Sequence, residues 1–182
     1  VVIDERMTRS ILLEAPNAET AHMAVSCVMA HKEDLAQCAA QTSRFARLLD
    51  IHSQMVGNLI YLRFEFSTGD AAGHNMATTA SETLLNCILR QHSELKYVSI
   101  SGNYCSDKKA TAVNGILGRG KNVITELLVP RKICEKYLHT TPEKMVDLNI
   151  KKNLLGTMLA GGIRSANAHF ANMLLGFYLA TG

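Results

Sequence analysis

Aromatic side chains are scarce in this sequence, where Phe, Tyr and Trp together make up 5% of 182 residues and Trp is absent. Proteins that hold single-stranded nucleic acid stack its bases on aromatic rings. The net charge is only +3, although residues 108–152 hold ten Lys or Arg against four Asp or Glu. Because these charges lie among glycines and acids, the sequence disfavours nucleic acid as a partner and favours a local anionic ligand.

Paired cysteines are also lacking. The five present are odd in number, widely spaced and never arranged as C-x-x-C, so neither a disulfide framework nor a zinc site is indicated. We therefore expect no bound metal and a reducing, cytoplasmic compartment. The five are Cys27, Cys38, Cys87, Cys105 and Cys134.

No signal segment opens the chain, and no long hydrophobic run is free of polar residues. The richest apolar stretch, residues 154–179, is interrupted by Arg164, His169 and Asn172, each costly in a bilayer. A soluble domain without a membrane segment is expected. Because the chain starts within an expected strand and stops at "LATG" without a capped end, we also expect it to be part of something longer.

The first half of the chain alternates between strand and helix patterns. The order strand, helix, strand, strand, helix, strand is the split ferredoxin-like pattern βαββαβ, which predicts an α+β fold. This unit would form a small domain, with a domain boundary near residues 99–101. The expected elements lie at residues 7–15, 19–40, 43–55, 59–68, 76–92 and 95–101, with a short connection "VGN" between the middle two strands.

The second half predicts a strand at residues 122–129, a short helix after Pro130 and a long helical stretch from Pro142 to the end. This last stretch is apolar nearly all round, which indicates a central, buried helix. Its one small and polar stripe either faces a ligand or packs closely on another backbone, and the residues alone leave both readings open. The stripe consists of Gly161, Gly162, Ser165, His169, Asn172 and Gly176.

Two segments in the first half are candidates for binding phosphate. In "STGDAAGHNM", Gly69 and Gly73 allow backbone N–H groups to face an anion at a helix N-terminus, but an ordinary turn capped by Asp70 or Asn75 explains the same residues. The spacing is not the G-x-G-x-x-G of the Rossmann fold. In "TSRFARL", residues 43, 44 and 47 (Ser, Arg, Arg) offer a phosphate grip or are merely exposed.

A third candidate is "SGNYCSDKK", where Asp107, Lys108 and Lys109 follow a strand end and a glycine. A lysine held by an aspartate stays charged, so it can polarise a carbonyl or stabilise an oxyanion. A solvated charge run is the competing interpretation. Cys105 has no histidine nearby to activate it, which favours inert packing.

With these motifs together, the sequence resembles the 3-hydroxy-3-methylglutaryl-coenzyme A (HMG-CoA) reductases, the mevalonate-forming family of isoprenoid biosynthesis. The blocks "ISGNYCSDKKATAVNGILGRGK" and "STGDAAGHNM" carry the resemblance. The segments "MTRS", "TSRFARL", "YLRF", "LNIKKNLLG" and "NAHFAN" follow the family in the same order. The resemblance implies a small nicotinamide-nucleotide domain at residues 10–99, inserted in a larger domain formed by residues 1–9 and 100–182. It also implies a loop at residues 106–109 that lines the active site, and a homodimer or a dimer of dimers that shares its active sites.

The resemblance also implies roles for individual residues. Lys108 would stabilise the oxygen of the thioester and of the later aldehyde during two hydride transfers, and Asp107 would orient Lys108. The substrates would be HMG-CoA and NADPH, the latter preferred over NADH because Ser43 and Arg44 match a site for the ribose 2′-phosphate. The remaining substrate positions are Arg9, Ser101, Asn103, Lys109 and Lys152, with His169 at coenzyme A; the remaining cofactor positions are Asp70, Gly73, His74 and Asn75.

The sequence departs from the family in two respects. The family turn usually reads D-A-M-G-M-N, whereas Ala72 and His74 stand here in place of the methionines. In addition, the family's catalytic glutamate, aspartate and histidine are expected to fall outside this sequence. A non-catalytic module that binds nucleotide or coenzyme A is therefore the alternative to the reductase.

Overall fold

A computed structural model describes residues 1–105, 111–156 and 170–182; in addition, the side chains of residues 2, 3, 152, 156, 170 and 171 are not described. The chain divides into two compact units. Unit 1 comprises residues 1–109 and 116–124, and unit 2 comprises residues 110–115 and 125–182. Helix α4 (Ala112–Leu117) lies where the chain passes between them.

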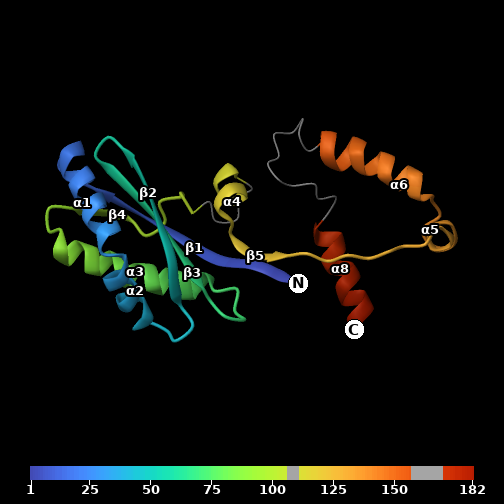
Figure 1. The fold of residues 1–182 in the computed structure, drawn as a ribbon, viewed down its shortest axis with the longest axis horizontal. Coiled ribbons are helices and arrows are strands. Elements are labelled where there is room, and N and C mark those ends of the chain that lie inside the picture. The colour runs from blue at the N-terminus through green and yellow to red at the C-terminus, as the bar shows by residue number, and fades with distance from the viewer. Residues whose placement is uncertain (106–110, 157–169) are drawn as a thin grey trace. The chain divides into compact units, whose positions relative to one another are not determined.

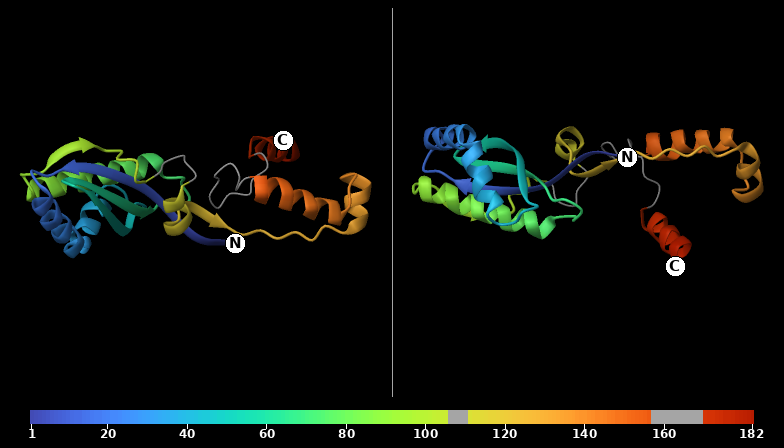
Figure 2. Two further views of the ribbon diagram at one scale, coloured as in Figure 1. Left: turned by 90° about the horizontal axis from the view of Figure 1, so that it is seen from above. Right: turned by 60° about the horizontal axis from the view of Figure 1, so that its bottom comes forward.

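Unit 1 is built on an antiparallel sheet. Strands β1 (Val2–Glu14), β2 (Arg47–Val56), β3 (Leu59–Ser67) and β4 (Lys96–Ser99) lie in the order β2-β3-β1-β4 (Figure 1). Every neighbouring pair is antiparallel. The first residues of β1 continue past the other strands and pair with β5 (Gly120–Val123), as Figure 2 shows. Strand β1 therefore touches three other strands.

Three helices cover one face of this sheet: α1 (Ala18–Ala30), α2 (Lys32–Ala40) and α3 (His74–Gln91). Alternate side chains of β3 are buried against them together with one stripe of α3, as expected where a strand of period 2 meets a helix of period 3.6. These residues are Ile60, Leu62, Phe64 and Phe66 from β3 and Ala77, Ala80, Leu84 and Ile88 from α3.

Local signals explain most element ends in unit 1. The Asn17 side chain accepts a hydrogen bond from the Thr20 amide at 2.8 Å and caps α1. Gly57, at φ +60°, forms with Asn58 the two-residue connection between β2 and β3, which confirms the predicted hairpin. The single helix expected at residues 19–40 is wrong in one respect. It breaks at His31, whose backbone leaves the helical region with φ −108° and ψ 34°.

The strand predicted at residues 122–129 is also wrong for most of its length, because β5 ends at Val123. Strand β5 pairs only with the start of β1, from Val2 to Arg6. The Ile124 amide still donates to the Val1 carbonyl at 3.0 Å. Residues 124–130 have no regular structure.

Unit 2 contains helices α5 (Arg131–Tyr137), α6 (Pro142–Leu148), a π-helix η1 (Asn149–Gly156) and α8 (Phe170–Thr181). The predicted helical stretch from Pro142 is confirmed at both ends, and residues 157–169 lie outside the described part. The expected burial is wrong for the part of α8 whose side chains are described. Phe177 is 60% exposed and Leu179 is 77% exposed, so none of the segments that the structure describes covers these two side chains.

None of the helices in the described ranges is both long and apolar enough to cross a bilayer.

Shortening Leu84 to Ala tests the packing of α3 on the sheet. Leu84 is fully buried, so Leu84→Ala removes apolar contacts and leaves a cavity. We expect the free energy of unfolding to fall by about 2–5 kcal/mol in urea denaturation. Thr79→Ala, at an exposed position of the same helix, is the matched control and should change it by less than about 0.5 kcal/mol. Equal effects of the two substitutions would contradict this packing.

Candidate functional site

The glycine-rich turn between β3 and α3 depends on Gly73 and Thr68 for its shape. Gly73 is the N-cap residue of α3 with φ +81°, and within the described chain no side chain caps this helix. A Cβ added at Gly73 would lie 2.3 Å from Cγ2 of Thr68, so both the backbone angle and the space require glycine. The Thr68 hydroxyl donates to the Ala71 carbonyl at 2.8 Å and closes the turn.

The interpretation of this turn as one capped by Asp70 or Asn75 is therefore wrong, because neither side chain caps α3. Asp70 is exposed in the turn, and His74 and Asn75 are the first two residues of the helix. The amides of an uncapped helix N-terminus attract an anionic group.

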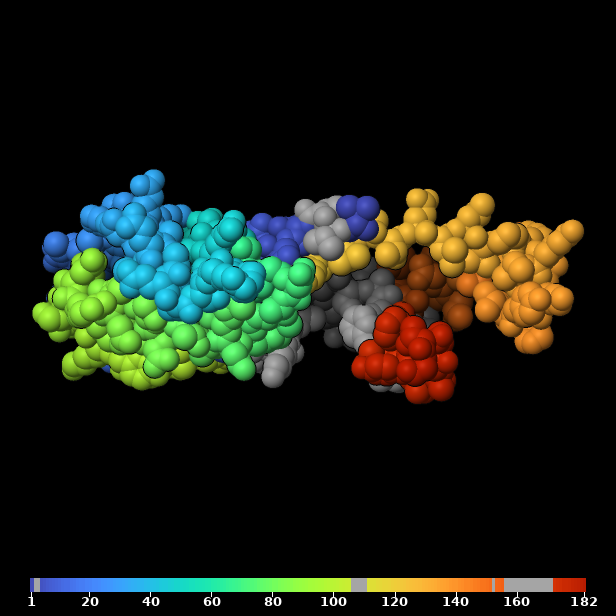
Figure 3. Space-filling model, turned by 90° about the horizontal axis from the view of Figure 1, so that it is seen from below, coloured from blue at the N-terminus to red at the C-terminus, as the bar shows by residue number. Residues whose placement is uncertain are grey.

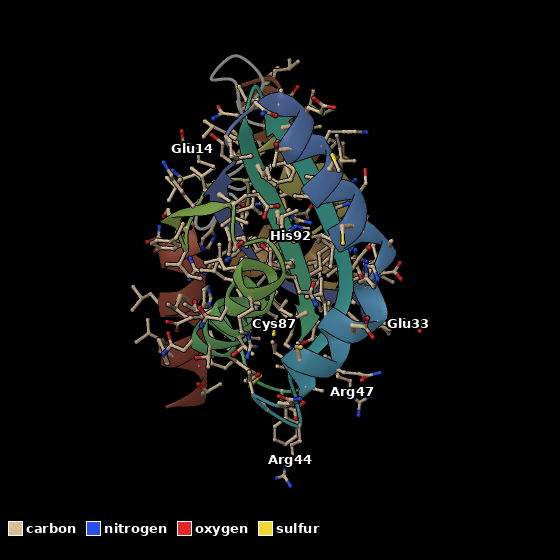
Figure 4. All side chains as sticks on the ribbon, turned by 90° about the vertical axis from the view of Figure 1, so that its left-hand side faces the viewer. Glu14, Glu33, Arg44, Arg47, Cys87 and His92 are labelled. Carbon is tan, nitrogen blue, oxygen red and sulfur yellow. The ribbon has the colours of Figure 1, made fainter. Side chains whose placement is uncertain are left out.

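The loop that carries Ser43 and Arg44 meets this turn through the ring of Phe45. The Phe45 ring lies beside Gly69, where an added Cβ would be 3.5 Å from its Cδ1 atom. The Arg44 guanidinium lies over the same ring, 4.7 Å from its centre, and Figure 4 shows Arg44 projecting from one end of the unit. The Ser43 hydroxyl accepts from the Phe45 amide at 3.1 Å. Two segments predicted from separate motifs thus lie together.

A small cavity of about 160 Å³ lies behind the turn. Lys121 lines it and ties the turn to the sheet, because its Nζ donates to the Gly69 carbonyl at 3.0 Å and lies 2.9 Å from Oε1 of Glu5. The complete lining is Glu5, Arg6, Met7, Thr68, Ala71, Ala72, Gly120 and Lys121.

Arg9 and Ser101, two predicted substrate residues, are brought together at the side of α3. Arg9 donates from Nη2 to the Thr78 hydroxyl at 2.6 Å and from Nη1 to the Ser101 hydroxyl at 3.4 Å. The amide of Gly102 donates to the Ser10 carbonyl at 2.7 Å and fixes this segment beside β1. Asn103 is exposed and has φ +62°.

On the opposite face of the sheet, the hydroxyl of Thr8 holds two distant residues. It donates to the Cys105 carbonyl at 3.4 Å and accepts from Nε of Arg119 at 3.1 Å. Cys105 is fully buried, as expected for an inert thiol. Cys105 and Arg119 flank the segment that contains Asp107, Lys108 and Lys109, so one side chain of β1 fastens both flanks of that segment.

A buried ion cluster supports the same region. Glu65 is completely buried and pairs with Arg63 and with Nη1 of Arg6 at 2.6 Å, and Nε2 of His52 lies 3.1 Å from its Oε1 atom. Arg63 also donates from Nη2 to the Gly118 carbonyl at 2.7 Å, next to Arg119. A buried carboxylate requires such partners, because desolvation of an unpaired charge costs several kcal/mol.

The sequence analysis missed this ion cluster. The alternation of Arg63 and Glu65 with apolar residues resembles any strand with a solvated face. The sequence of β3 carries no sign that its polar face is buried, because the residues that cover this face come from the segment around Gly118. Burial lowers the pKa of His52, opposed by the nearby Asp50 carboxylate, so His52 is neutral at pH 7.

Several predicted residues are not placed. Asp107, Lys108, Lys109 and His169 lie outside the described residues, and so does the side chain of Lys152, whose backbone belongs to η1. Within the described ranges no three His, Cys, Asp or Glu side chains gather as metal ligands.

Comparison with known proteins gives a consistent family. The family model described as "Hydroxymethylglutaryl-coenzyme A reductase" matches residues 1–182. The chain is 46% identical to the 3-hydroxy-3-methylglutaryl-coenzyme A reductase of Pyrococcus abyssi and 47% identical to that of Pyrococcus horikoshii, over all of this chain and 44% of each relative. The enzyme of the same name from Phycomyces blakesleeanus is 43% identical over 16% of its length.

The chain therefore spans less than half the length of the curated relatives it matches. Among solved structures, it is similar to a class II 3-hydroxy-3-methylglutaryl-CoA reductase from Streptococcus pneumoniae bound to NADPH. That likeness has a TM-score of 0.46 and 21% identity over 59% of this chain and 31% of the other, which is too partial to support a conclusion about function.

Replacing His52 tests the electrostatics of the ion cluster. The unfolded chain protonates this imidazole near pH 6.5, whereas burial lowers its pKa in the folded chain. The unfolded state then binds more protons, so stability falls as the pH drops through about 6.5, by at most about 1.4 kcal/mol per pH unit. We expect His52→Gln to flatten the dependence of the unfolding free energy on pH between about 7 and 5.5.

The matched control is His22→Gln, which removes an exposed imidazole of α1 and should leave the pH dependence as it is. Urea denaturation at each pH gives the unfolding free energy. If the unfolding free energy of His52→Gln depends on pH as it does in the unmodified protein, His52 titrates alike in the folded and unfolded states, which would contradict the prediction.

Proposed function

Because the chain belongs to the hydroxymethylglutaryl-coenzyme A reductase family, we propose that the protein carrying it reduces HMG-CoA to mevalonate and free coenzyme A, with two equivalents of NADPH. The observation that carries this proposal is the pairing of Arg9 with Ser101 beside the uncapped turn of α3. The guanidinium and the hydroxyl would bind a carboxylate, and the helix N-terminus would bind a phosphate.

Arg9 is suited to hold the free carboxylate of the hydroxymethylglutaryl group. A guanidinium binds carboxylate oxygens in bidentate geometry, and Thr78 already accepts from two of its nitrogens, at 3.1 and 2.6 Å, which fixes the plane of the group. We propose that Ser101, Asn103, Lys109 and Lys152 complete this substrate site and that His169 contacts coenzyme A.

The nucleotide would lie along the glycine-rich turn before α3 and along the loop of Ser43 and Arg44, which meets that turn through the ring of Phe45. The turn fits a phosphate, because Gly73 leaves room where a Cβ would clash and none of the described side chains caps α3. Ser43 and Arg44 would hold the ribose 2′-phosphate, so NADPH is preferred to NADH. Asp70, Gly73, His74 and Asn75 would bind the rest of the nucleotide.

Ala72 lines the cavity behind this turn. Methionine, the residue that the family usually has there, is larger by several atoms, so its replacement by Ala leaves space. We propose that the turn is consequently less tightly supported than in other members of the family.

Lys108 would supply the positive charge for both reductive steps. NADPH supplies the hydride, and the carbonyl oxygen becomes an oxyanion that the ammonium of Lys108 stabilises. Breaking the carbon–sulfur bond then gives the aldehyde and the thiolate of coenzyme A. The thiolate takes up a proton. The second hydride transfer and a proton on the aldehyde oxygen give the alcohol of mevalonate. Asp107 would orient Lys108.

We further propose that residues 10–99 form a ferredoxin-like domain for NADPH, within a larger domain formed by residues 1–9 and 100–182. The strand order β2-β3-β1-β4, with antiparallel neighbours and helices on one face, supports the ferredoxin-like part. We propose a homodimer that shares its active sites. The exposed apolar side chains of α8, such as Phe177 and Leu179, support burial against the rest of the protein or a second copy.

Lys108→Ala in the full-length protein tests the proposed chemistry. Loss of the oxyanion-stabilising charge should lower kcat by at least about 10²–10³-fold, because the rest of the site does not replace it. Lys132→Ala, at an exposed position of α5, should keep normal turnover. Circular dichroism establishes that both variants are folded. Normal turnover by folded Lys108→Ala would refute the role.

Arg44→Ala tests the cofactor assignment. We expect the KM for NADPH to rise about tenfold or more, since a bidentate contact to phosphate is lost, while the KM for NADH stays the same. Lys96→Ala removes one exposed positive charge of β4 and serves as the control. Steady-state oxidation of the two nucleotides supplies the four constants. A parallel rise for NADPH and NADH would contradict a 2′-phosphate contact.

A further inference from the structure

Two cysteines that the proposed reaction does not use lie against each other in unit 1. Cys38 belongs to α2 and Cys87 to α3, and their sulfur atoms are 3.1 Å apart although 49 residues separate them in sequence. Both are free thiols. Figure 3 shows the two helices side by side on the surface of the unit, and Figure 4 marks Cys87.

The surroundings make the two thiols unequal. Nη2 of Arg90 lies 3.1 Å from the Cys87 sulfur, and its Nε donates to the Asn86 carbonyl at 3.3 Å, which fixes the guanidinium in place. The positively charged guanidinium of Arg90 is therefore in direct contact with the Cys87 sulfur. The contact with Cys87, together with burial, raises the pKa of Cys38, so Cys38 stays protonated.

We propose that Cys38 and Cys87 are a redox-active dithiol that closes to a disulfide on reaction with a peroxide or a low-molecular-weight disulfide, and so fastens α2 to α3. Closure requires the sulfurs to approach from 3.1 Å to about 2.05 Å. That shift of about 1 Å is within the reach of side-chain rotation and small helix movements.

With hydrogen peroxide, the reaction balances in two steps. The Cys87 thiolate attacks one peroxide oxygen, which breaks the O–O bond and gives a sulfenic acid and hydroxide. The Cys38 sulfur then attacks the sulfenic sulfur and the S–OH bond breaks, so hydroxide leaves and the thiol proton is released. Two thiols lose two electrons and two protons, and the peroxide becomes two molecules of water.

Cys27 provides an internal comparison. It lies on α1, more exposed than Cys87, and among the interactions described its sulfur lies 3.6 Å from Nδ1 of His31. Cys87 is only 7% exposed. Exposure alone therefore predicts that Cys27 reacts with an oxidant first, whereas a paired dithiol predicts that Cys38 and Cys87 are consumed together.

The test uses the full-length protein, treated with a small excess of hydrogen peroxide and, separately, with glutathione disulfide. Remaining thiols are alkylated and the peptides are mapped by mass spectrometry. We expect a Cys38–Cys87 cross-linked peptide 2 Da lighter than the sum of its reduced parts, loss of alkylation at both sites, and full reversal by dithiothreitol. Because the readout is mass, its failure is distinguishable from failure of the proposed reductase activity.

Three variants sharpen the result. Cys38→Ser should abolish the cross-link, and Cys27→Ser should leave it unchanged. Arg90→Gln should slow closure by about five- to tenfold at pH 7, because the positive charge that contacts the Cys87 sulfur is then lost. The oxidised protein should also unfold at a temperature several degrees higher than the reduced one, a gain that Cys38→Ser lacks.

Alkylation of Cys38 and Cys87 to the same extent before and after oxidant would overturn the proposal. So would separate oxidation of either sulfur, to a sulfenic or sulfinic acid, without a cross-link. An Arg90→Gln variant that closes at the normal rate would overturn the part assigned to the guanidinium.

Discussion

The alternation of side chains along β1 is the constraint on which the candidate site depends. Successive residues of a strand point to opposite faces, so Arg9 reaches Thr78 of α3 while Thr8 reaches the other face. There the Thr8 hydroxyl contacts Cys105 and Arg119, the two flanks of the segment that contains Lys108. A slip of one residue in the pairing of β1 would exchange the two faces and separate both sets of contacts. Pairing with β3, β4 and β5 fixes this register.

The polar face of the sheet adds a second constraint. Glu65 and Arg63 are fully buried, so each needs its partners to offset the loss of hydration. Arg63 also donates to the Gly118 carbonyl, and this bond forms only while the returning segment covers the sheet. The charges therefore select one position for that segment. An apolar face, which has no such directional bonds, would permit several positions of the segment.

Much of unit 1 follows from local patterns. The helix expected at residues 76–92 is α3, His74–Gln91, because its apolar stripe and the glycine turn before it agree. The hairpin at Gly57 follows from turn chemistry. The early end of β5 and the burial of Glu65 were not predictable in this way, since each depends on residues distant in sequence. The break at His31 was not predicted either. The joining of Arg44 to the turn through Phe45 is likewise a tertiary contact that no spacing reveals. For the candidate site, the motifs indicated which side chains could bind anions, and the proposed role of each residue came from the resemblance to a family.

Strand β1 contacts α3 through Arg9 and contacts both flanks of the segment that contains Lys108 through Thr8. The proposed reaction at this place is two successive reductions of one thioester. The ratio of NADPH oxidised to coenzyme A thiol released by the full-length protein tests this claim most directly. Absorbance at the nicotinamide band and a thiol reagent measure the two quantities in one reaction. The account predicts two molecules of NADPH for each thiol, with mevalonate as the product. A ratio of one with aldehyde as the product, or binding of both ligands without any oxidation, would contradict it.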